Sequence, residues 1–240
     1  MTDSTPHPHE ETPLSSPPAD RSLVEDVLLL LFQPQSRTIA GENILFYVLA
    51  GAAVTDLALS GRIETRQQRL FSRPVHAVGA ARPTDELLAP VWDLVEEKPR
   101  GVQTVLASVG PNLRRPTLER LVERGDLRAE QYRALGIFPS TRYALGSERR
   151  AELLEKVRST LIDGVDPDER TAASIALLSA SDTLPQFHAE IPWSGTVYTR
   201  AKELEQGDWG ATAAASAVAR TVASIVTNAL VTAAVTAART

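Results

Sequence analysis

Several arginines surround a short apolar turn, and this combination is the chain's best candidate for chemistry. The turn contains Leu135, Ile137 and Phe138 and is punctuated by Gly136 and Pro139, which favours a hairpin or bent loop over a continuous helix. The arginines that flank or precede it are Arg114, Arg115, Arg120, Arg124, Arg128, Arg133 and Arg142. An apolar tip beside guanidinium groups suits a surface that is both anionic and apolar, as a phospholipid membrane is. The competing interpretation is that the three apolar side chains fold back into the protein's own core.

A winged helix that binds DNA is a second interpretation of the same region. Residues 116–145 have the order of that motif: a basic helix that ends at Gly125, a strand, a turn and a second strand. The helix would enter the major groove and the wing would contact phosphate. The net charge of −5 and the carboxylates of Glu119 and Glu123 oppose this interpretation, because both repel the phosphate backbone. We therefore expect no nucleic-acid partner, and a winged-helix-like DNA-binding regulator stays the alternative function.

The remaining residues of catalytic type are not arranged as an active site. The chain has no cysteine, which excludes disulfides, thiolate metal sites and cysteine nucleophiles. It contains neither a glycine-rich phosphate loop nor the motifs of zinc proteases and serine hydrolases. The four histidines lie in the polar N-terminal tail or far apart in the chain: His7, His9, His76 and His188. We therefore expect a protein that is not an enzyme and that uses no cofactor and no metal ion.

Helices are the elements that must position the arginines. Ser22 and Glu25 fit a capping box, in which each side chain accepts a hydrogen bond from the other residue's backbone N–H. Asp168 is placed to cap a later helix. Apolar spacing predicts helices over residues 22–33, 42–60, 84–97, 102–109, 112–125, 147–161, 168–181 and 211–238. Short strands are predicted at residues 62–65 and 70–78, so the fold class is mainly α.

Composition divides the chain into a tail and one domain. Residues 1–21 are rich in proline and serine and are predicted to be disordered. Residues 22–240 are predicted to form a single compact helical domain with a few short β-strands, a projecting β-hairpin and a polar loop at residues 187–198. Residues 211–238 are rich in alanine, but Arg220 within them opposes a membrane span, so a buried core helix is expected. No signal peptide is evident, and we expect a cytoplasmic protein.

Four separated segments resemble the Golgi phosphoprotein 3 family, whose members also occur in high-GC Gram-positive bacteria. These segments are residues 56–63, 121–127, 135–142 and 179–184. Their order and spacing match those of the family, and the resemblance extends from Ser22 to the C-terminus. It identifies the chain as a bacterial, actinobacterial member.

The resemblance implies a mostly helical domain that binds membranes peripherally, in this chain at the inner face of the membrane. In eukaryotic members a basic pocket holds the head group of phosphatidylinositol 4-phosphate. A hydrophobic hairpin of those members inserts into the bilayer or mediates self-association. That hairpin corresponds here to Leu135, Ile137 and Phe138. The expected partners are therefore an anionic phospholipid membrane and a second copy of the chain.

The resemblance also implies where the head group would bind. One of the family's head-group arginines matches Arg114, and Arg115 and Arg37 are the candidates to replace others. The positions of a tryptophan and two further arginines carry Gly41, Ala50 and Pro111. This departure opposes specificity for phosphatidylinositol 4-phosphate and favours a less selective site for anionic, phosphoinositide-like head groups.

Overall fold

Helices α1 (Leu23–Leu31) and α2 (Leu45–Leu59) form the centre of the fold. The computed structural model describes residues 21–66, 74–79, 81–134, 137–207 and 213–237. Every residue of α1 is buried, as are most residues of α2. The predicted capping box of α1 is confirmed, since Ser22 Oγ accepts a hydrogen bond from the N–H of Glu25 (3.3 Å) and Glu25 Oε2 accepts one from the N–H of Ser22 (2.9 Å).

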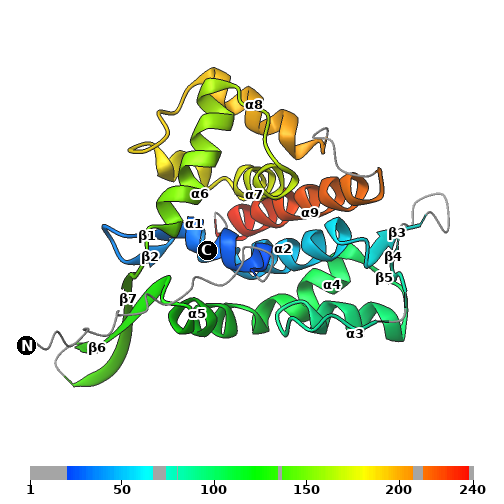
Figure 1. Cartoon of the computed structure of the whole chain (residues 1–240), viewed down its shortest axis with the longest axis horizontal. Coiled ribbons are helices and arrows are strands. Elements are labelled where there is room, and N and C mark those ends of the chain that lie inside the picture. The colour runs from blue at the N-terminus through cyan, green and yellow to red at the C-terminus, as the bar shows by residue number, and fades with distance from the viewer. Residues whose placement is uncertain (1–20, 67–73, 80, 135–136, 208–212, 238–240) are drawn as a thin grey trace, which may run out of the picture.

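The other helices cover α1 and α2 on two sides (Figure 1). One side carries α3 (Ala89–Glu97), α4 (Val102–Val109) and α5 (Arg114–Glu123), and the other carries α7 (Glu169–Ala180) and α9 (Ala213–Ala237). Outside α7 lie α6 (Arg149–Arg158) and α8 (Gly195–Glu205). Contacts of α2 with α4, α7 and α9, and of α1 with α5, α6 and α7, unite these layers in one hydrophobic core. The predicted mainly α fold is confirmed.

The strands are short and antiparallel. β1 (Phe32–Gln33) pairs with β2 (Thr38–Ile39), and β4 (Pro74–Ala77) pairs with both β3 (Ile63–Thr65) and β5 (Arg100–Gly101). The strand predicted at residues 62–65 is β3. The strand predicted at residues 70–78 is confirmed over β4, while residues 70–73 lie outside the described residues. β1, β2 and β5 are too short to show the alternation by which a strand is recognised in sequence.

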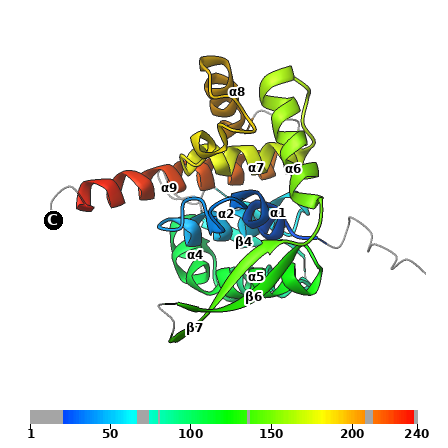
Figure 2. The ribbon, with the colours of Figure 1, turned by 90° about the vertical axis from the view of Figure 1, so that its left-hand side faces the viewer.

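A two-stranded hairpin projects from the helical body (Figures 1 and 2). It consists of β6 (Leu127–Ala134) and β7 (Phe138–Leu145), in a register that pairs Leu127 with Leu145 and Ala134 with Phe138. The hairpin follows α5 directly, so the basic helix and the apolar turn are joined as the sequence predicts.

The loop predicted at residues 187–198 is wrong at its C-terminal end, because α8 begins at Gly195. Ser194 Oγ accepts a hydrogen bond from the N–H of Val197 (3.2 Å) and caps the helix. The spacing of Val197, Ala201 and Leu204, which are all buried, is helical and packs α8 against α7. Glycine at the first position has a low helix propensity, so the sequence does not indicate a helix here. Tertiary packing nevertheless stabilises it.

Helix α9 is a core helix over its first half, as predicted. Ala215, Val218, Val222 and Val226 are buried where α9 contacts α2 and α7. Its C-terminal end projects beyond the other helices (Figure 2). None of the helices in the described residues is long and apolar enough to cross a membrane.

Candidate functional site

The hairpin is anchored to the body at Asp126, the residue before β6. This side chain is 2% exposed and forms ion pairs with Arg21 (2.6 Å) and Arg149 (2.8 Å). It also accepts a hydrogen bond from Ser147 Oγ (2.8 Å), while its backbone oxygen accepts one from the N–H of Gly146 (2.9 Å). Because these partners lie before α1 and after β7, one buried residue fixes both ends of the hairpin to the body.

One face of the hairpin combines an aromatic ring with an arginine. Tyr132 pairs with Ser140 across the strands, and the guanidinium of Arg142 lies 4.2 Å from the centre of the Tyr132 ring. Hydrogen bonds from Ser140 and Arg142 lower the pKa of Tyr132. Alternation along the strands places Phe138 on this same face, two residues from Ser140. An aromatic body with a polar end is the side-chain chemistry found at membrane–water interfaces.

The tip of the hairpin is apolar and exposed. Ile137 is 69% exposed and Phe138 is 58% exposed, the two highest values among the large apolar side chains described. The interpretation that they fold into the core is therefore wrong, because the strands carry them away from the helices. Leu135, the third residue assigned to the tip, lies outside the described residues. Within the described chain, Arg133 beside the tip has no ion-pair partner.

Arg114 and Arg115 are the first two residues of α5. No side chain caps this helix, and its first turn contains no acidic residue. The N-terminus of a helix carries a partial positive charge, so two arginines there create a strongly anion-attracting position. In the structure, each of the two arginines is paired with a carboxylate. Arg114 Nε lies 2.6 Å from Glu42 Oε1, and Arg115 Nε lies 2.7 Å from Glu119 Oε1.

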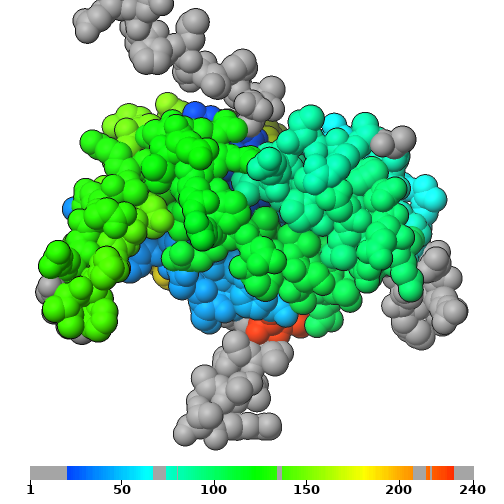
Figure 3. All heavy atoms as spheres, turned by 90° about the horizontal axis from the view of Figure 1, so that it is seen from below, coloured from blue at the N-terminus to red at the C-terminus, as the bar shows by residue number. Residues whose placement is uncertain are grey.

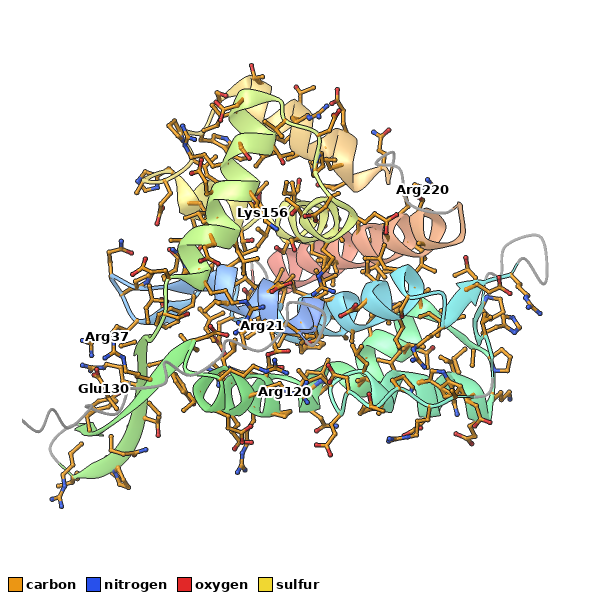
Figure 4. All side chains as sticks on the ribbon, in the orientation of Figure 1. Arg21, Arg37, Arg120, Glu130, Lys156 and Arg220 are labelled. Atoms are coloured by element: carbon orange, nitrogen blue, oxygen red, sulfur yellow. The ribbon has the colours of Figure 1, made fainter. Side chains whose placement is uncertain are left out.

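Arg37 lies in the turn between β1 and β2 and reaches the hairpin. Its Nη1 lies 2.7 Å from Oε2 of Glu130 on β6, and Figure 4 shows the two side chains facing each other beside the hairpin. Its φ of 59° is in the left-handed region of backbone conformation. Residues other than glycine and asparagine rarely adopt this conformation. An arginine held in this conformation suggests that its side chain is needed at this place.

The three arginines assigned to the head group come from two different parts of the fold. Arg37 lies beside the hairpin, whereas Arg114 and Arg115 lie at the far end of α5, about 15 Å from β6 for a helix of this length. Figure 3 shows this face of the molecule, on which the surface of α5 and the hairpin (green) extends from the centre to the protruding hairpin at the left edge. The arrangement is an extended basic surface with an apolar end.

Comparison with known proteins places this whole arrangement in one family. The family model described as Golgi phosphoprotein 3 (GPP34) matches residues 23–221, from the start of α1 into α9. The chain belongs to the Golgi phosphoprotein 3 family. No curated protein matches the chain. The matched range contains the hairpin, α5 and the turn that carries Arg37.

Two positions at which the Golgi phosphoprotein 3 resemblance implies head-group residues hold small residues with little space around them. Gly41 stands at the position expected for a tryptophan, has a φ of 67°, and lies so close to Thr183 that an added Cβ would be 2.7 Å from its Cγ2. Ala50, at an arginine position, is fully buried in α2. A larger side chain at position 41 would strain a left-handed backbone and displace the Thr183 side chain, and one at position 50 would have to enter the buried core.

Two further arginines, Arg120 in α5 and Arg124 directly after it, pair with carboxylates of the body. Arg124 Nε lies 3.0 Å from Oε1 of Glu25, a fully buried carboxylate of α1, and Arg120 Nη1 lies 2.6 Å from Asp85 Oδ1. Figure 4 shows Arg120 on the side of α5 that faces the body. Arg124 therefore satisfies a buried carboxylate, and Arg120 pairs with a half-buried one.

A buried ionic network continues from Glu25 into α2 and α7. Asp26 pairs with Arg149 and with Arg170 (2.8 Å), and Arg170 lies 3.2 Å from Asp56. Burial raises the pKa of Asp56, although Arg170 and a hydrogen bond from the N–H of Leu23 (2.6 Å) oppose the rise. Asp56 is thus a buried carboxylate whose oxygens have hydrogen-bond and ion-pair partners.

A small cavity lies against this network. It has a volume of about 60 Å³ and is lined by Asp26, Lys156, Asp168 and Arg170 among others. This volume holds about two water molecules, which is too little for a phosphorylated sugar head group. The buried network is therefore a structural feature, and the exposed arginines and the hairpin remain the candidate site.

Proposed function

We propose that this member of the Golgi phosphoprotein 3 family is a peripheral membrane protein that binds anionic phospholipid. It is a binding protein and not an enzyme, and it acts at the inner face of the membrane. The observation that carries the proposal is the exposure of Ile137 (69%) and Phe138 (58%) at the end of a hairpin whose base is fixed by buried ion pairs. A rigid arm with an apolar tip suits reversible insertion at a lipid interface.

Two weak contributions together support such binding. Complete burial of one isoleucine or phenylalanine side chain contributes about 1.5–3 kcal/mol, and insertion at an interface contributes less. Each arginine held near an anionic leaflet adds about 1 kcal/mol, and salt screens this contribution. Neither contribution alone anchors a protein stably, so the apolar tip and the arginines must act together.

The lipid selectivity that the surface supports is low. Arg114 and Arg115 each pair with an exposed carboxylate, and Arg37 lies on a different element. Dispersed arginines respond to the charge density of a leaflet and not to the stereochemistry of one head group. We therefore propose that acidic phospholipids in general are bound, without preference for phosphatidylinositol 4-phosphate.

Vesicle flotation tests this proposal. We expect the protein to float with phosphatidylcholine vesicles that contain phosphatidylglycerol and to float much less with phosphatidylcholine alone. Phe138→Asp should abolish most of the binding, whereas Val165→Asp is the matched control, because Val165 is 52% exposed and follows the helical turn after α6. Raising the salt from about 0.1 M to about 1 M shortens the Debye length from about 10 Å to about 3 Å and should also release the protein. Binding that is indifferent to both Phe138→Asp and salt would overturn the proposal.

The winged-helix alternative is an outcome of the same experiment. A basic helix followed by a hairpin is present, but Arg120 and Arg124 pair with carboxylates of the body. Salt-sensitive binding to duplex DNA without flotation would favour the DNA-binding function. Self-association through the hairpin would appear in sedimentation as a dimer or larger species that Phe138→Asp dissociates.

A further inference from the structure

We propose that Glu42 and Glu130 act as resident counter-ions that restrict this surface to strongly anionic membranes. The inference rests on the proposed function and adds a means of selection to it. Of the three arginines assigned to the head group, two are paired with a carboxylate from a distant part of the chain: Arg37 with Glu130 and Arg114 with Glu42. Both pairs are solvent-exposed, so lipid phosphates can reach them.

The pair between Arg37 and Glu130 joins elements that are 93 residues apart in the sequence. Its atoms are 2.7 Å apart, and the two side chains are 38% and 49% exposed. Exposed ion pairs of this kind contribute little to stability. The left-handed conformation of Arg37 opposes folding slightly, so a purely stabilising role does not explain why an arginine occupies this turn.

The pair between Arg114 and Glu42 places a carboxylate where an anionic ligand would bind. Glu42 precedes α2 and follows Gly41, whose left-handed backbone turns the chain toward α5. Its carboxylate contacts Arg114 at the uncapped N-terminus of α5 (2.6 Å). Carboxylate and phosphate compete for the same guanidinium because both are oxygen anions that accept its N–H groups. Glu42 thus occupies the position that a lipid phosphate would take.

Selection follows from the exchange of partners. When an arginine moves from its glutamate to a lipid phosphate, the glutamate is left unpaired and faces a leaflet of its own charge. On a weakly anionic membrane, the loss of the pair and this repulsion offset the new contact. On a strongly anionic membrane, many phosphates compete and the exchange is favourable. Two such pairs make binding depend more steeply on the anionic lipid fraction than the arginines alone would.

A structural role for the two pairs predicts the opposite result of substitution. If the Arg37–Glu130 pair served only to hold the hairpin in its binding orientation, Glu130→Gln would loosen the hairpin and weaken membrane binding. If Glu130 is a resident counter-ion, the same substitution frees Arg37 and removes a repelling charge. Binding would then become stronger, although the side chain keeps its size.

The experiment compares flotation of the full chain with phosphatidylcholine vesicles of rising phosphatidylglycerol content. We expect Glu42→Gln and Glu130→Gln each to lower the phosphatidylglycerol fraction required for half-maximal binding and to raise the vesicle affinity about fivefold at low salt, the effect of one charge near the leaflet. Glu155→Gln is the matched control, because Glu155 is an exposed partner of Arg158 within α6 (3.3 Å). It changes the net charge by the same amount and should leave the threshold unchanged. Inorganic phosphate is added as a competitor. It should displace the protein only weakly from a lipid surface, whereas it should compete strongly if the arginines form a site for free phosphate.

The outcomes separate this inference from the proposed function. If the wild type floats and neither glutamine variant shifts the threshold, or if either variant weakens binding, the counter-ion role is wrong and membrane binding stands. If neither the wild type nor the variants float at any phosphatidylglycerol content, both proposals are wrong. Flotation of the variants alone supports the inference in its strongest form, in which the glutamates mask the surface.

Discussion

Replacing Arg37 with glycine should separate the stability of the fold from its binding surface. Arg37 has a φ of 59° in the turn between β1 and β2, where glycine adopts the left-handed conformation without strain. The glycine variant loses the exposed pair with Glu130 (2.7 Å) and one of the cations of the proposed membrane surface. Its effects on folding and on binding therefore have different origins.

The magnitudes follow from the structure. A side chain in the left-handed region opposes folding by about 1–2 kcal/mol, and an exposed pair contributes about 0–1 kcal/mol. Glycine also gains conformational entropy in the unfolded chain, about 0.5–1 kcal/mol. The three effects nearly cancel, so Arg37→Gly should be as stable as the wild type within about 1 kcal/mol. Arg37→Ala keeps the strain and loses the pair, and it should be less stable than Arg37→Gly by about 0.5–1 kcal/mol.

The assay combines urea unfolding with vesicle flotation. Both variants should bind phosphatidylglycerol vesicles about fivefold more weakly than the wild type, because each loses one charge near the leaflet. A glycine variant that is clearly less stable than the alanine variant would refute the claim that Arg37 is strained. Vesicle affinity equal to that of the wild type in both variants would refute its part in the binding surface.

Two further substitutions test the anchoring of the hairpin and the pH dependence of the fold. Asp126→Asn removes a buried carboxylate from Arg21 and Arg149 and should destabilise the protein by about 3–5 kcal/mol, with faster proteolysis of the hairpin; an unchanged unfolding midpoint would show that these pairs do not fix it. Burial alone would raise the pKa of Asp168, but hydrogen bonds from Thr171 at the start of α7 and the nearby charge of Lys156 together outweigh it and lower the pKa overall. The stability that Asp168 contributes is therefore present above its unfolded pKa of about 3.9 and is lost as the pH falls through the lower folded value. Asp168→Asn should be less stable than the wild type at neutral pH and equal to it in strong acid, and a difference that persists in strong acid would contradict this.

The features that sequence predicts well are those set by neighbouring residues. The capping box of Ser22 and Glu25 depends on a spacing of three residues and is present in the structure. The hairpin depends on turn residues between two extended segments and is also present. Helix α8 was missed because its stability comes from burial of Val197 and Leu204 against the rest of the protein, not from propensity.

The buried ionic network could not be predicted, since its partners are far apart in the chain. Arg21 and Asp126 are 105 residues apart, and Asp26 and Arg170 are 144 residues apart. A signal was nevertheless present: Glu25 and Asp26 interrupt an otherwise apolar helix whose every residue is buried. Buried carboxylates require cationic partners, so these two residues indicate that some arginines of the chain are structural.

Some arginines pair with carboxylates of the body and others stay exposed. This difference decides what kind of binding surface the chain can offer. Arg120 and Arg124 satisfy carboxylates of the body, and Ala50 is buried in α2, so none of these three positions adds an exposed cation to Arg114 and Arg115. The arginines that stay exposed are spread between the hairpin and the start of α5, with glutamates beside them. In the function that we propose, a surface of this kind responds to the charge density of a membrane, and the apolar tip of the hairpin provides the attachment. Selectivity among membranes must then come from the balance of arginine and glutamate, which makes Glu42 and Glu130 as informative to substitute as the arginines themselves.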